Sequence, residues 1–161
     1  MTAMLRTLDE LVEAARARPA AKIAVAAGHD PDVIEALKRA ADVGLATGTL
    51  FGNEEKIRAL ARTAGCELAD EQVVHEPEDT KAAYRAIAMI REGRAGLLMK
   101  GKISSGTLLH AVLDKEAGLR TGRLLSQVIV FQVPGFDRLM LMSDAAVNIA
   151  PTLEQKADIC R

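Results

Sequence analysis

The 161-residue chain is poor in the side chains on which several classes of protein depend. It contains no tryptophan, one tyrosine and three phenylalanines, so few rings are available to stack on nucleic-acid bases. A formal net charge of -1 supplies no basic field to attract a phosphate backbone. We therefore expect no nucleic-acid partner.

Cysteines and long apolar stretches are also scarce. Cys66 and Cys160 stand in no Cys-x-x-Cys spacing, and His29, His75 and His110 are scattered, so we expect neither a disulfide framework nor a metal site. No apolar run approaches the length that crosses a bilayer, and charged residues near the start argue against a signal peptide. These features favour a cytoplasmic protein with no membrane partner.

What the sequence does contain is an alternation of apolar strands and amphipathic helices. We expect a first helix over residues 4–15 and strands over residues 22–27, 47–51, 73–74 and 96–99, with a helix after each strand. Parallel strands need such helical crossovers, so the pattern predicts an α/β fold whose mostly parallel sheet is covered on both faces.

The pattern changes in the last part of the chain. Residues 125–133 and 139–142 are predicted to form two antiparallel strands joined by a turn, the second of them buried. Thr152 and Gln155 have the spacing of a capping box, which predicts that a further helix begins there.

The loop after residues 96–99 is rich in groups that bind anions. It carries two ammonium groups and three hydroxyls directly before a helix, at Lys100, Lys102, Ser104, Ser105 and Thr107. Helix N-termini and glycine-rich turns bind phosphate through free backbone N–H groups. The loop is therefore a candidate phosphate or carboxylate site, and the alternative is an ordinary connection between a strand and a helix.

This loop resembles a P-loop but departs from it at a decisive position. Gly96, Gly101 and Lys102 have nearly the required spacing, yet Ile103 stands where a magnesium-binding Ser or Thr is needed. We therefore reject a P-loop NTPase.

Three further features are candidates for the same site. Arg120 and Arg123 flank a glycine and offer planar donors for phosphate oxygens, unless they belong to a solvated surface loop. Asp144 and Asn148 follow a strand, where polar groups reach a cleft, although such a pair is commonly a turn and cap. His110 lies one helical turn past the hydroxyl loop.

Several of these residues lie in segments whose order and spacing resemble the phosphate acetyl/butyryltransferase family, and most closely its phosphate butyryltransferase branch. The segments are LMKGKIS at residues 98–104, GLRTGRLLS at residues 118–126, PGF at residues 134–136 and DAAVNIAP at residues 144–151. The similarity is continuous from Lys22 onward and covers nearly the whole chain.

The resemblance implies a three-layer αβα fold like that of isocitrate and isopropylmalate dehydrogenases, usually forming a homodimer or higher oligomer. It implies an acyltransferase that moves a short acyl group, butyryl or acetyl, between CoA and inorganic phosphate to give acyl phosphate. It also implies that acyl-CoA is a substrate and that no cofactor is tightly bound. The catalytic residues stay unassigned, and the residues expected to bind phosphate or CoA are Lys100, Ser104, Ser105, Thr107, His110, Arg123, Asp144 and Asn148.

Two departures qualify what the resemblance implies. His110 stands where an arginine is expected, and members of the family continue well past residue 161. We therefore interpret residues 1–161 as an N-terminal α/β part of a phosphate acyltransferase, with residues 125–161 a candidate start of the interdomain region. In that case the strands at residues 125–133 and 139–142 lack part of their cover. The alternative is a non-catalytic module that binds phosphate or CoA.

Overall fold

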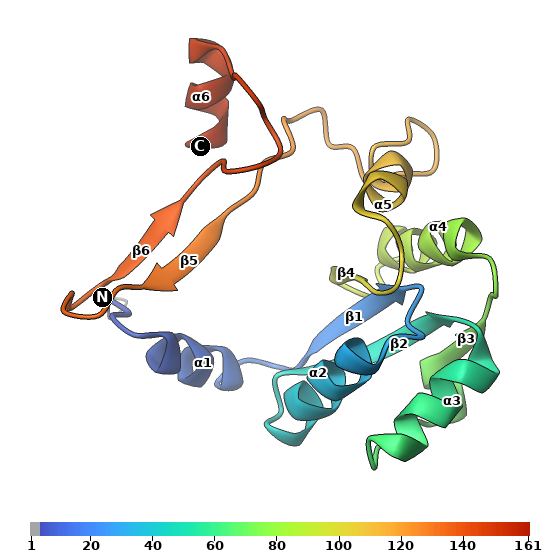
Figure 1. Cartoon of the computed structure of the whole chain (residues 1–161). Helices are drawn as coiled ribbons and strands as arrows, with labels where there is room; N and C mark the ends of the chain where they lie inside the picture. The colour runs from blue at the N-terminus through green and yellow to red at the C-terminus, as the bar shows by residue number, and fades with distance from the viewer. Residues whose placement is uncertain (1–3) are drawn as a thin grey trace. The chain divides into compact units, whose positions relative to one another are not determined.

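The computed structural model describes residues 4–161, which fall into two compact units (Figure 1). One unit is Arg18–Arg120, and the other combines the residues up to Ala17 with Thr121–Arg161. The larger unit holds the parallel sheet and the loop from Lys100 to Thr107, whereas the smaller unit holds Arg123, Asp144 and Asn148.

The larger unit is built on a four-stranded parallel sheet in the order β3-β2-β1-β4. Its strands are β1 (Ala21–Ala26), β2 (Ala46–Gly52), β3 (Val73–His75) and β4 (Leu97–Lys100). Its helices are α2 (Pro31–Asp42), α3 (Glu54–Thr63), α4 (Asp79–Arg91) and α5 (Ser105–Val112), with a short 3₁₀ helix, η1 (Asp70–Gln72), before β3. The predicted alternation of strands and helices is confirmed.

The starts of α2 and α3 follow from local side-chain chemistry. The Asp30 carboxylate accepts the backbone N–H groups of Asp32 and Val33 at 3.0 and 3.3 Å. The Asn53 side chain accepts the N–H of Lys56 at 3.0 Å. Such caps satisfy N–H groups that have no partner inside the helix, so each helix begins where its capping residue stands.

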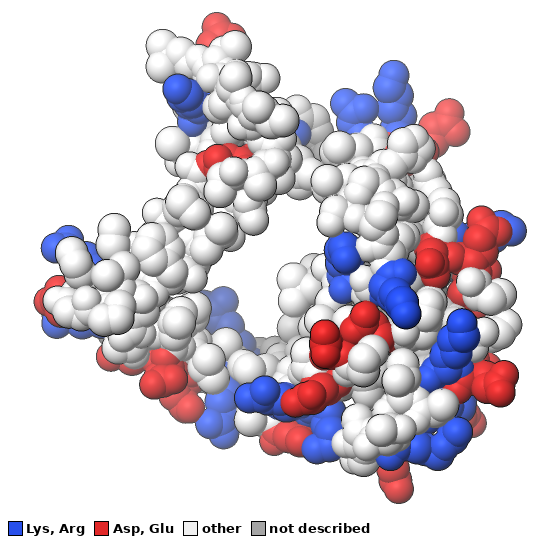
Figure 2. Space-filling model, in the orientation of Figure 1, with Lys and Arg blue, Asp and Glu red and all other residues white. Residues whose placement is uncertain are grey.

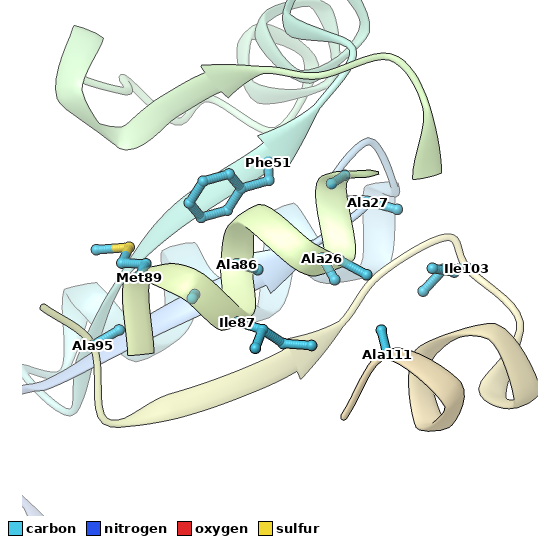
Figure 3. Packing of buried hydrophobic residues seen from close by; sticks show 12 residues of the cluster. Ala26, Ala27, Phe51, Ala86, Ile87, Met89, Ala95, Ile103 and Ala111 are labelled. Carbon is cyan, nitrogen blue, oxygen red and sulfur yellow. The ribbon is translucent and has the colours of Figure 1, made fainter. Parts of the chain in front are cut away.

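Two apolar clusters cover opposite faces of the sheet. Because side chains alternate along a strand, Val25 faces one layer while Ala24 and Ala26 face the other. The first cluster joins the sheet to α4 and α5 and includes Phe51 and Ile87 (Figure 3). The second cluster joins the sheet to α2 and α3 through Val33, Ile34, Leu37, Ile57 and Ala61. The unit is therefore a three-layer α/β/α sandwich, as the sequence predicts.

Charged side chains cover the outer faces of α2 and α3 with both signs interleaved (Figure 2). Pairs one helical turn apart account for part of this mixture, since Lys38 lies 3.0 Å from Asp42 and Arg58 lies 2.8 Å from Glu54. The face drawn in Figure 2 offers no continuous basic surface over these two helices.

The smaller unit contains an antiparallel hairpin and two helices. Its strands are β5 (Ile129–Gln132) and β6 (Leu139–Met142), paired with Ile129 opposite Met142, and its helices are α1 (Leu8–Arg16) and α6 (Leu153–Ile159). The predicted antiparallel pairing and the capping box between Thr152 and Gln155 are both confirmed.

Two boundaries in the smaller unit differ from the prediction. The first strand occupies only Ile129–Gln132, because the carbonyls of Leu125 and Gln127 accept hydrogen bonds from side chains of the loop after β6. The first helix begins at Leu8 rather than at residue 4, because the Thr7 hydroxyl caps it by accepting the N–H of Glu10 at 3.1 Å.

Residues 139–142 form a strand, as predicted, but the prediction that this strand is buried is wrong. Leu141 is 71% exposed, and further along the chain Ile149 is 92% exposed. Apolar side chains of both strands are exposed, among them Val130, Met140 and Met142. Among the helices of residues 4–161, none is both long and apolar enough to cross a membrane.

Candidate anion-binding site

The candidate loop leaves the sheet at a point where the chain diverges. In the register of the sheet, Ala26 at the end of β1 pairs with Lys100 at the end of β4. The chain then continues from β1 into α2 on one face and from β4 into α5 on the opposite face. A divergence of this kind at the carboxyl ends of parallel strands opens a crevice where ligands bind.

The first half of the loop is closed onto β1 and the turn that follows it. The N–H groups of Gly101 and Lys102 donate to the carbonyls of Ala26 and Ala27, both at 2.8 Å. Ile103 is buried in the same cluster as Ala111 of α5 (Figure 3). The residue that breaks the P-loop pattern is therefore an apolar anchor, and this half of the loop offers few free donors.

The second half of the loop presents polar groups at the start of α5. The Ser104 hydroxyl accepts the N–H of Thr107 at 3.0 Å and lies 2.7 Å from the Thr107 hydroxyl. Within residues 4–161, no hydrogen bond is found for the backbone N–H groups of Ser105 and Gly106. The first turn of α5 also carries no acidic side chain, so nothing in that turn offsets the positive end of the helix dipole.

The basic residues near this loop lie in different surroundings. Lys100 and Lys102 are exposed, and the Lys100 ammonium group donates to the carbonyl of Gly101 at 3.4 Å. His110 is exposed too, but it lines a depression of about 380 Å³ formed with Leu113, Asp114, Lys115, Glu116 and Arg120. That depression does not include Ser104, Ser105 or Thr107, so His110 shares a surface with the end of α5 rather than with the hydroxyls.

Arg123 in the smaller unit is bound to α6. Its guanidinium donates to the backbone carbonyl and the carboxylate of Asp158 at 3.2 and 3.3 Å, and its side chain stays 59% exposed. The N–H of Leu124 donates to the same carboxylate and is the main reason that the pKa of Asp158 is lowered. Sequence reasoning missed Asp158, because 35 residues separate it from Arg123 and no local pattern links them.

Asp144 and Asn148 are brought together, but they bind each other. The Asn148 amide donates to Asp144 at 2.5 Å and to the carbonyl of Leu125 at 2.9 Å. The other carboxylate oxygen of Asp144 accepts the N–H groups of Val147 and Ala146 at 2.9 and 3.1 Å. These bonds, led by that of Val147, lower the pKa of Asp144 to about 2. The pair forms a clasp between two loops, which matches the turn-and-cap interpretation.

The predicted residues thus form separate groups. Lys100, Ser104, Ser105 and Thr107 share one loop of the larger unit, and Asp144 and Asn148 share one turn of the smaller unit. In the part of the chain that the structure describes, no three His, Cys, Asp or Glu side chains gather as metal ligands would.

The fold places the chain in a structural class. A phosphotransacetylase from Streptococcus pyogenes superimposes with a TM-score of 0.77 at 19% identity, over 96% of this chain and 56% of that one. A branched-chain phosphotransacylase from Enterococcus faecalis V583 superimposes with a TM-score of 0.66 at 23% identity, over 86% of this chain and 48% of that one. The chain therefore has the α/β fold seen in phosphotransacylases.

Sequence comparison identifies the family. Residues 69–161 match the family described as Phosphate acetyl/butaryl transferase, and the chain belongs to it. A phosphate butyryltransferase from Clostridium acetobutylicum is 37% identical over 97% of this chain and 52% of its own length. A phosphate acetyltransferase from Rhizobium meliloti is 42% identical over 94% of this chain and 48% of its own length. The chain spans about half the length of these relatives, and the predicted family is confirmed.

The clasp at Asp144 predicts a specific dependence of stability on pH. Because the pKa of Asp144 is about 2 in the folded state and 3.8 in its ordinary state, its ionised form stabilises the fold. This contribution is fully present above pH 3.8 and is lost as the pH falls through about 2. Denaturation of the wild type and Asp144→Asn should differ at pH 6, and the difference should shrink below pH 4. A carboxyl carbon NMR titration with a midpoint at the ordinary value would contradict the assignment.

Proposed function

We propose that the protein transfers a short acyl group between CoA and inorganic phosphate, giving acyl phosphate. The observation that carries this proposal is its membership of the Phosphate acetyl/butaryl transferase family, with named relatives aligned over nearly the whole chain. Relatives of both the butyryl and the acetyl kind match at 37% and 42% identity, so identity alone does not select the acyl group. The proposed substrates are butyryl-CoA, acetyl-CoA and phosphate.

The reaction sets requirements that the candidate loop can meet. A phosphate oxygen attacks the thioester carbonyl, a tetrahedral oxyanion forms, and the carbon–sulfur bond breaks to release the CoA thiolate. Near neutral pH inorganic phosphate is a monoanion or dianion whose oxygens are strong acceptors, so fixed donors are needed to hold it in line with the carbonyl. We assign this role to the N–H groups of Ser105 and Gly106 and the hydroxyls of Ser104 and Thr107, within the field of Lys100.

The finer structural and cellular expectations also belong to this proposal. The three-layer sandwich of the larger unit supports an architecture like that of isocitrate and isopropylmalate dehydrogenases, with the active site in a cleft. A homodimer, a cytoplasmic location and the absence of a tightly bound cofactor remain predictions. Arg123, with its side chain more than half exposed, is the proposed contact to a phosphate group of CoA or to phosphate itself.

A second candidate function is a non-catalytic module that binds phosphate or CoA. One observation favours it: the side chains of Asp144 and Asn148 are hydrogen-bonded to each other, and Asn148 also bonds to a neighbouring loop. Such a module would bind the anion at the loop before α5 without turnover. Measuring released thiol from butyryl-CoA and acetyl-CoA, with and without phosphate, distinguishes the two. Phosphate-dependent release is expected, and binding of phosphate with no release would favour the module.

The role of the backbone at α5 can be tested with a proline. Ser105 is the first residue of α5, a position that proline favours, and Ser104 before it is already extended with φ -64° and ψ 145°. Ser105→Pro should therefore keep the helix but remove one N–H donor. Loss of a hydrogen bond to a charged group costs about 1.5–3 kcal/mol, so phosphate should bind roughly 10- to 100-fold more weakly by NMR titration.

The matched control is Ser105→Ala, which removes the hydroxyl and keeps the N–H. If the backbone holds the anion, this control should bind phosphate within about threefold of the wild type, a difference of under 1 kcal/mol. Equal phosphate affinity in Ser105→Pro and the wild type would remove the helix start from the site.

The proposed contact of Arg123 with phosphate or CoA can be tested by enzyme kinetics. Arg123→Ala should raise the Michaelis constant for phosphate or CoA, or lower turnover, by a factor equivalent to about 1.5–3 kcal/mol. Arg123→Lys keeps the charge but loses the planar fork, so it should recover only part of the rate. Asp158→Asn is the control, because it removes the ionic partner of Arg123 and leaves the guanidinium in place. If Arg123→Ala leaves the Michaelis constants and the turnover unchanged, residues 120–123 are a surface loop with no part in substrate binding.

A further inference from the structure

We propose that His29 is a positioning residue, which fixes the turn that supports the Lys100–Thr107 loop. The importance of this role for substrate rests on the proposed function, whereas the positioning itself does not. His29 lies in the turn between β1 and α2, and its ring contacts the ends of two other elements.

The turn holds the loop through a strained residue. Ala27 has φ 55°, a left-handed conformation that alanine rarely adopts, and its carbonyl accepts the N–H of Lys102 at 2.8 Å. The backbones approach so closely that a Cβ atom on Gly101 would lie 2.2 Å from the carbonyl oxygen of Ala27. The direction of this one carbonyl therefore sets where the loop can lie.

His29 stands two residues after Ala27 in the same turn. Its side chain is 11% exposed, and its Nε2 atom lies 3.6 Å from the carboxylate of Asp79 at the start of α4. Its Nδ1 atom is buried with no hydrogen-bond partner among residues 4–161. This atom faces Gly52 at the end of β2 so closely that a Cβ atom there would lie 2.9 Å away. The ring thus fills the space between β2 and α4.

Two neighbours anchor the rest of the turn, and His29 supplies the remaining link. The N–H of Gly28 donates to the carbonyl of Phe51 at 2.8 Å, and the Asp30 side chain caps α2. These bonds join the turn to β2 and α2 only. The pair of His29 and Asp79 joins it to α4, which lies on the same face of the sheet as α5 and the loop. The Gly28 N–H belongs to the same peptide unit as the Ala27 carbonyl, so its bond to Phe51 holds that unit to β2, and the pair of His29 and Asp79 adds the hold to α4.

The test is amide hydrogen exchange in the intact protein, combined with phosphate titration. His29→Phe keeps a planar ring and loses the polar contact to Asp79. We expect exchange of the Gly101 and Lys102 amides to accelerate about tenfold, while the amide of Val25 in β1 stays protected. Phosphate affinity should fall by a similar factor. Asp79→Asn should have the same effect, and the double variant should be no worse than either single one.

The matched control is His75→Phe, which makes the same change at the end of β3, two strands away from β1. It should leave the exchange of Gly101 and Lys102 unchanged. If these two amides exchange at the wild-type rate in His29→Phe, or if Val25 accelerates in parallel with them, the positioning role is refuted. If the wild type binds no phosphate, the proposed function fails while the exchange result still decides the role of His29.

Discussion

Two backbone hydrogen bonds between the ends of β1 and β4 are the constraint on which the larger unit depends. They join the amides of Gly101 and Lys102 to the carbonyls of Ala26 and Ala27 at 2.8 Å. In a parallel sheet, strands that leave toward opposite faces would otherwise separate at once. Here the chain stays in contact for two more residues, and this contact brings the start of α5 to the carboxyl edge of the sheet. Any side chain at position 101 would abolish it.

Small side chains also dominate the face of α4 that packs on the sheet. The side of α4 that faces the sheet carries Ala82, Ala83 and Ala86, all fully buried, together with the larger Ile87 and Met89. Small side chains let a helix lie close to a sheet, and dense interiors leave no space for rings between such surfaces. Phe51 is the buried aromatic residue of this cluster and lies on β2 (Figure 3), while Tyr84 of α4 packs against the cluster and is only partly buried.

Local features of the fold could be predicted from sequence, while features that depend on distant partners could not. Asp30, Asn53 and Thr152 were predictable caps because each bonds to a residue two or three positions away. The position of β4 beside β1 depends on pairing across more than 70 residues, and no local pattern encodes it. The shortened β5 has the same cause, since Asn148 binds the carbonyl of Leu125 from 23 residues away.

The same distinction applies to the candidate site. The sequence shows which polar groups are present, but it does not show which of them already have a hydrogen-bond partner within the protein. The resemblance and the spacing selected Asp144, Asn148 and Arg123 alongside the loop, yet each of these three bonds to another part of the smaller unit. A carboxyl group whose pKa is about 2 is also a poor proton acceptor near neutral pH, so Asp144 is unsuited to act as a general base.

The N–H groups at the start of α5 differ. Among the described residues they have no hydrogen-bond partner, so no existing bond has to break when an anion binds. A substrate that must replace an existing hydrogen bond gains little, whereas one that satisfies an unpaired donor gains its full value. The start of α5 is therefore the stronger candidate for holding phosphate.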